Sequence, residues 1–208
     1  MQRKPRSVTG YLRLIRSLMM AAVCAVAVTS SSLHARGSRV GETCGLTRWA
    51  VKTLDAPQSL LLSSAIRATT IEYLDAQRPR FDPRLMRVRP IETTLWRVRA
   101  RLIGYKIEVD SDYHLILQSP TSMLTLIGEI PAPYCSVRER NRYIAARAQV
   151  NRIGHHRATR RWWWLDYRGA TAPLVRVTGY GFYDYEHGQV GASHNDVEIH
   201  PVLDVQRI

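Results

Sequence analysis

The sequence predicts a mainly β domain, a small five-stranded barrel with one helix between its third and fourth strands. Three segments in which apolar and polar side chains alternate follow one another between residues 94 and 130, and two more lie between residues 173 and 203. One helix-like segment separates the two groups. Three strands, a helix and two strands is the order of an OB fold, a Greek-key barrel. The alternative is an open β sandwich in which residues 48–54 supply an extra edge strand.

The first 35 residues have the order of a secretory signal peptide. Five basic residues precede the apolar run 18–28, and a Ser-rich stretch leads to Ala35. The run is shorter than the ~20 residues that span a bilayer. We therefore expect cleavage near Ala35, no transmembrane segment in the mature chain, and a periplasmic or extracellular location. Val23 is larger than the residue that usually precedes a lipoprotein cysteine, which argues against that role for Cys24.

The composition is basic. Lys and Arg number 30 against 17 Asp and Glu, and the formal net charge is +13. Loss of residues 1–35, with five basic residues and no acid, lowers it to +8. Positive charge raises encounter rates with nucleic acid, anionic lipid or acidic glycans at low salt. The charge favours an anionic partner, although an arginine bias also follows from codon usage.

Two cysteines remain once Cys24 is removed. An even pair, Cys44 and Cys135, predicts one disulfide in an exported protein. The bond would tie the N-terminal arm to the middle of the domain. The alternative is two unrelated thiols; a catalytic thiol is disfavoured because neither cysteine has a histidine beside it in sequence.

Residues 36–93 are predicted to form an N-terminal arm and residues 94–208 the barrel domain. In the arm, TRWAVKTL (residues 47–54) alternates like a short strand. Residues 58–74 fit either a helix or an extended stretch with turns. Prolines then mark a loop between residues 78 and 90.

The first barrel strand has the clearest pattern, because apolar side chains alternate with three arginines in WRVRARL (residues 96–102). The arginines are expected to form a solvated face. Gly104 permits a bulge or bend, and residues 105–109 continue the strand. Turns separate the next two strands, at residues 113–117 and 123–130.

The predicted helix spans residues 136–151. Ser136 and Glu139 have the spacing of a capping box, and Gly154 is a stop signal. The predicted apolar stripe consists of Val137, Ile144, Ala148 and Val150.

Five sequence blocks, in order along the chain, carry a resemblance to known proteins. They are RWAVKTL (48–54), GYKIEVDSDYHLIL (104–117), EIPAPYC (129–135), VTGYGFYDYEHGQVG (177–191) and EIHPVL (198–203). In these blocks the chain resembles a family of uncharacterised exported bacterial proteins. The resemblance covers most of the mature chain and implies an OB-like domain outside the cytoplasm, with no established activity to carry over. Residues 152–170 and the pair Ser193 and His194 depart from the family's pattern.

Histidines and acids recur along the predicted strands. Glu198 and His200 are two residues apart and share a strand face, as do Asp112 and His114. Imidazole and carboxylate groups bind zinc or similar divalent ions and also act as general bases. The candidate ligand or metal cluster comprises His114, Glu129, Asp184, His187, Glu198 and His200. The alternative is that each of these side chains makes a structural hydrogen bond or ion pair.

The stretch between the helix and the fourth strand combines arginines with three consecutive tryptophans. The candidate binding surface comprises Arg157, Arg160, Arg161, Trp162, Trp163 and Trp164. Such a mixture suits base stacking with phosphate contacts, which OB folds use on single strands. It also suits a membrane interface. The alternative is that the indoles pack under the helix or over an end of the barrel.

These features predict an exported binding module for an extracytoplasmic polymer or protein, with no cofactor except a divalent metal in the cluster. An anionic polymer or a partner protein is the expected partner. One alternative is a secreted hydrolase, phosphodiesterase-like or nuclease-like, that uses the His/Glu/Asp cluster, although no residue arrangement matches the thermonuclease site. A third is a structural or inhibitor-like domain. The catalytic residues of a hydrolase are not identified. Four glycines between residues 179 and 191 are not followed by a helix, which argues against a phosphate-binding loop.

Overall fold

The fold is a mainly β domain. The computed structural model describes residues 44–45, 48–78, 87–166, 170–185 and 188–208, so the predicted signal peptide lies outside the described residues. Residues 38–208 belong to one compact unit. Within the described ranges, no helix has the length and apolar character needed to cross a membrane.

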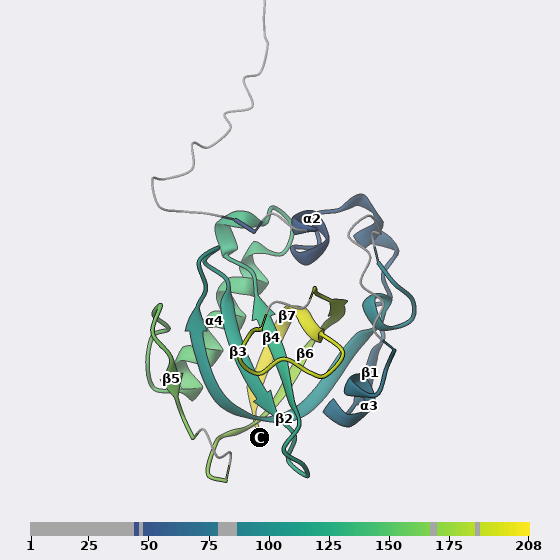
Figure 1. The fold of residues 1–208 in the computed structure, drawn as a ribbon. Coiled ribbons are helices and arrows are strands. Elements are labelled where there is room, and N and C mark those ends of the chain that lie inside the picture. Colours follow the sequence, from purple (N-terminus) through teal and green to yellow (C-terminus); the bar gives the residue numbers. More distant parts are fainter. Residues whose placement is uncertain (1–43, 46–47, 79–86, 167–169, 186–187) are drawn as a thin grey trace, which may run out of the picture. The chain divides into compact units, whose positions relative to one another are not determined.

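Five strands close a barrel (Figure 1). They are β2 (Leu95–Ile107), β3 (Tyr113–Gln118), β4 (Thr125–Ile130), β6 (Leu174–Tyr183) and β7 (Val197–Arg207). Neighbours pair in the order β2-β3-β4-β7-β6 and back to β2; β4 and β7 are parallel and the other pairs antiparallel. Helix α4 (Arg140–Ile153) lies in the connection from β4 to β6. This order confirms the predicted OB-like barrel and excludes the open sandwich.

Closure of the barrel depends on strand β2, which pairs with both β6 and β3. Its first half pairs with β6, and its second half pairs with β3 after a register shift between Leu102 and Gly104. The predicted bend at Gly104 is therefore present. The short strand β5 (Trp163–Trp164) pairs with β2 at Gly104 and Tyr105. A Cβ atom on Gly104 would lie 2.9 Å from the Trp164 ring, so the absence of a side chain lets β5 approach.

The core lies between the inner faces of the strands and α4. Helix α4 buries Tyr143, Ala146, Val150 and Ile153. The predicted stripe was wrong except for Val150: Val137 is 88% exposed and Ile144 49%, and Ala148 is also exposed. Helix α4 begins at Arg140, four residues later than predicted, and the face that packs on the barrel is the one that carries Tyr143, next to the predicted face. The Glu139 N–H still donates to Ser136 Oγ at 3.2 Å, one half of the predicted capping box.

The N-terminal arm consists of short elements that pack on the barrel. They are α2 (Trp49–Lys52), η2 (Pro57–Leu61), β1 (Ile66–Thr69), α3 (Ile71–Asp75) and η3 (Ile91–Thr93). The predicted strand at residues 47–54 was wrong. Main-chain hydrogen bonds from the Lys52 N–H to the Arg48 carbonyl and from the Thr53 N–H to the Trp49 carbonyl close a helical turn here instead. Strand β1 pairs in parallel with β2, and the predicted Cys44–Cys135 disulfide is present, with Cα atoms 5.8 Å apart.

Candidate functional site

Histidine and carboxylate side chains gather on the outer face of β3, β4 and β7. Leu115, Ile130 and Ile199 belong to the apolar core. Strand alternation therefore directs the residues between them outward. We call Asp112, His114, Glu129, Asp184, Glu198 and His200 the acid–histidine cluster. All six are buried, because α2 and residues 188–196 cover this face.

His200 is the centre of the cluster and is 0% exposed. Its Nδ1 atom lies 2.9 Å from Glu198 Oε1 and 3.0 Å from Glu129 Oε2. Its Nε2 atom faces Asp112 Oδ2 at 3.6 Å. Asp112 is held from its other oxygen, because the Ala132 N–H donates to Oδ1 at 2.7 Å. One imidazole thus faces carboxylates from β4, β7 and the β2–β3 connection.

Glu129 joins His200 to the second histidine. Its Oε1 atom lies 3.4 Å from His114 Nδ1, which also faces Glu108 Oε1 at 3.2 Å. On the other side of the ring, His114 Nε2 lies 2.9 Å from the Val190 carbonyl. Residues 188–196 approach closely at Gly191, where a Cβ atom would lie 2.8 Å from the Ile116 side chain. The covering segment is therefore bound to the same strand that carries His114.

A lysine of the arm supplies positive charge to the cluster. Lys52 Nζ lies 3.2 Å from Asp184 Oδ2, and the two side chains are 14% and 7% exposed. The same ammonium lies 5.0 Å from the centre of the Phe182 ring. The Phe182 ring is in turn 5.6 Å from the His200 ring. Helix α2 thus brings a cation over the end of β6, against the Phe182 ring that also contacts His200.

Burial and charge pairing shift the pKa values of the cluster. Burial and the nearby Glu129 charge raise the pKa of Glu198 to about 7. Burial opposes ionisation of Glu129, yet hydrogen bonds from His114 and His200 hold its pKa well below the usual range. Burial disfavours the charge on His114 and Lys52, but the facing carboxylates prevail: they raise the pKa of His114 to about 9 and that of Lys52 above its ordinary value.

The pKa of His200 is also raised, although burial and the Lys52 charge oppose the shift, because Asp112, Glu129 and Glu198 all face the ring. Glu129 therefore stays ionised, whereas the neighbouring Glu198 gains a proton near neutral pH. A proton can be shared between the Glu198 carboxyl group and the His200 imidazole, which lie within hydrogen-bond distance. Glu198 and Asp184 also line a small pocket with Tyr185 and Gln189, so this edge of the cluster lies closest to the surface.

The structure brings four of the six sequence-predicted cluster residues into direct contact, namely His114, Glu129, Glu198 and His200. Asp184 joins them through Lys52. His187 lies outside the described residues. The prediction did not include Lys52 or Glu108. Lys52 is in the arm, and no local sequence pattern predicts that the arm contacts the barrel. Glu108 is close to Asp112 and His114 in sequence, and this closeness could have indicated that it joins the cluster.

The tryptophans lie beside the cluster and are oriented by β5. Trp162 makes an edge contact with the His114 ring, with ring centres 5.3 Å apart, and Lys106 Nζ lies 4.8 Å from the Trp162 ring centre. Trp164 stacks on Trp162 at 5.0 Å and is 46% exposed. Trp163 points the other way and stacks on His156 at 4.1 Å. The outer surface of the pair is thus an indole face open to solvent.

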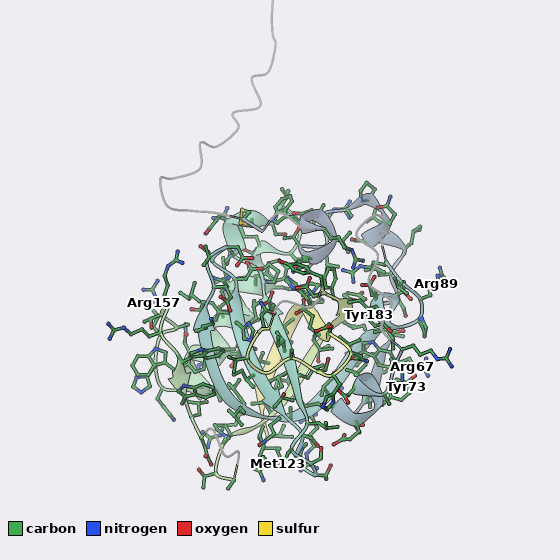
Figure 2. The ribbon with its side chains drawn as sticks, viewed as in Figure 1. Arg67, Tyr73, Arg89, Met123, Arg157 and Tyr183 are labelled. Carbon is green, nitrogen blue, oxygen red and sulfur yellow. A yellow bond between two sulfur atoms is a disulfide. The ribbon has the colours of Figure 1, made fainter. Side chains whose placement is uncertain are left out.

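Three arginines belong to the same segment as these tryptophans. Arg157, Arg160 and Arg161 are exposed, and Figure 2 shows Arg157 at the periphery of the molecule. Among the described residues, no hydrogen bond or ion pair partner is found for their guanidinium groups. We call residues 157–164 the basic-aromatic insert. Trp162 and Trp163 are half-buried, so the prediction that the indoles pack on the barrel describes these two and not Trp164.

Replacement of Lys52 by Met is expected to lower the free energy of unfolding by about 2–3 kcal/mol, because it removes a mostly buried cation from facing carboxylates. Urea denaturation of Lys52→Met, Asp184→Asn and the double variant measures the coupling of the pair, expected at about 1–2 kcal/mol. Arg142→Met is the control, since the Arg142 side chain is 61% exposed and its ion pair with Glu139 should contribute about 0–1 kcal/mol. A coupling near zero would contradict this account of Lys52.

No protein-family model and no curated protein matches the chain, so the geometry of these two regions carries the functional interpretation.

Proposed function

We propose that the protein is an exported binding module for an anionic polymer, which it recognises through the basic-aromatic insert. The observation that carries the proposal is the stacked pair Trp162 and Trp164, whose outer indole is 46% exposed. The same segment carries three exposed arginines whose guanidinium groups have no partner among the described residues. An exposed indole stacks on the flat ring of a base or on a sugar face, and arginines bind phosphate, sulfate or carboxylate.

The position of the insert in the fold supports this proposal. OB folds bind oligonucleotides and oligosaccharides on the outer face of their second and third strands and with the adjoining loops. Those strands are β3 and β4 here, and Trp162 contacts His114 on β3. Residues 188–196 already cover part of this face. The basic-aromatic insert therefore supplies the solvent-exposed part of this binding face, next to the part that residues 188–196 cover.

Hydrolysis has weaker support. Glu129 and His200 are 4% and 0% exposed, beneath α2 and residues 188–196. A substrate would reach only the Glu198 edge of the cluster through the pocket beside Asp184. Efficient general acid–base catalysis needs the group within hydrogen-bond reach of the substrate. The buried geometry instead suits charge pairing or an ion.

Binding is expected to weaken steeply with salt. If the three arginines each displace a counterion from a single-stranded polymer, affinity should fall about 20-fold between 50 and 200 mM salt. Tryptophan fluorescence titrations with oligo(dT) and with heparin measure this fall and distinguish a nucleic acid from an acidic polysaccharide. Absence of binding to both polymers at 50 mM salt would overturn the proposal.

Two variants test the insert directly. Trp164→Ala should weaken binding about 10-fold, since a stacked base contributes ~1–3 kcal/mol, and the triple change of Arg157, Arg160 and Arg161 to Gln should flatten the salt dependence. The matched control replaces Arg138, Arg140 and Arg142, exposed arginines near the other end of α4, about 20 Å away along the helix. Equal losses in the two triple variants would show that net charge, and not the insert, drives binding.

A further inference from the structure

We infer that Asp112, Glu129 and His200 form a divalent-metal site, with zinc as the ion that their chemistry fits. One potential ligand atom from each side chain lies within 4.8 Å of those from the other two, and all three residues are buried. In tetrahedral coordination at ~2.1 Å, ligand atoms lie about 3.4 Å apart, so a contraction of about 1.4 Å suffices.

An unsatisfied ring nitrogen points to the same place. His200 Nε2 is buried and has no hydrogen-bond partner among the described residues, and its distance of 3.6 Å to Asp112 Oδ2 exceeds hydrogen-bond length. Buried polar atoms are nearly always satisfied. A cation between Nε2 and Oδ2 would satisfy both atoms, and Asp112 would keep its Oδ1 bond to the Ala132 N–H.

The ligand types favour zinc over calcium or magnesium. Calcium and magnesium take oxygen ligands, whereas zinc accepts an imidazole together with carboxylates and can complete its four-coordinate shell with a water. Two carboxylates and one imidazole from β4, β7 and the β2–β3 connection form such a mixed set. The site is independent of the basic-aromatic insert, so its failure would leave the polymer-binding proposal standing.

Zinc titration of the chelator-treated protein tests the inference. We expect one equivalent of Zn²⁺ to bind in isothermal titration calorimetry and to raise the melting temperature, while Ca²⁺ at equal concentration does neither. Asp112→Asn should weaken Zn²⁺ binding at least about 10-fold, because it replaces an anionic ligand by a neutral amide but can still accept from the Ala132 N–H. His194→Gln is the control, since His194 is exposed and pairs with Asp75 outside the cluster.

A second measurement keeps the test decisive if Asp112→Asn does not fold. Co²⁺ added to the wild-type protein should give the visible absorption of a tetrahedral N/O site, and Zn²⁺ should displace it. Binding that persists in Asp112→Asn, binding that is lost in His194→Gln, or wild-type protein with no Zn²⁺ effect and no Co²⁺ spectrum would overturn the inference.

Discussion

Replacement of both Cys44 and Cys135 by serine is expected to lower the free energy of unfolding by about 4–5 kcal/mol. The two residues are 91 apart in sequence, and the chain-entropy description of a cross-link assigns a loop of this length a contribution of that size. A typical domain is stable by only ~5–15 kcal/mol. The variant should therefore retain a small part of the stability of the oxidised protein.

Urea denaturation of the oxidised protein, the reduced protein and the double serine variant measures this effect. The reduced protein should unfold at the same urea concentration as the double serine variant. Reductant should not lower the stability of that variant further. The disulfide also bears on the site, because Lys52 follows Cys44 by eight residues and contacts Asp184. If the double variant lies within about 1 kcal/mol of the oxidised protein, the arm is held by its packing alone.

Replacement of Glu92 by Gln is expected to lower the free energy of unfolding by about 3–5 kcal/mol. Glu92 is 0% exposed, and its carboxylate accepts from Arg48 Nη1 at 2.9 Å and Arg48 Nη2 at 2.7 Å. It also accepts from the main-chain N–H groups of Val88 and Tyr183. Gln removes the charge and turns an N–H₂ group toward these donors, so a buried guanidinium loses its counterion and donors are left unsatisfied.

Denaturation of Glu92→Gln beside Glu139→Gln isolates the effect of burial. Glu139 pairs with Arg142 at 3.5 Å, but Arg142 is 61% exposed, so that change should cost less than about 1 kcal/mol. Similar losses in the two variants would mean that the buried pair contributes no more than a surface pair. The expected difference would show that a buried ion pair joins two segments of the arm that are 44 residues apart in sequence.

The barrel itself could be predicted because its signals are local. Alternation in residues 96–102 and the glycine at position 104 describe a half-buried strand with a bend, and both are present in β2. The order of strands and helix then leaves few topologies. The pair of cysteines was likewise enough for the disulfide. The error at residues 47–54 arose because a segment of eight residues fits both the strand and the helical period, and the chain forms a helical turn at Trp49–Lys52.

Side-chain period also placed His114, Glu129, Glu198 and His200 on one side of the barrel wall. What the local pattern left open is whether an outward-facing side chain meets water. Helix α2 and residues 188–196 pack over these four residues, through contacts of Lys52 with Asp184 and of His114 with the Val190 carbonyl. Those contacts join segments between 76 and 132 residues apart. Long-range packing therefore turned a polar strand face into a buried charged cluster, because burial is a property of the assembled fold.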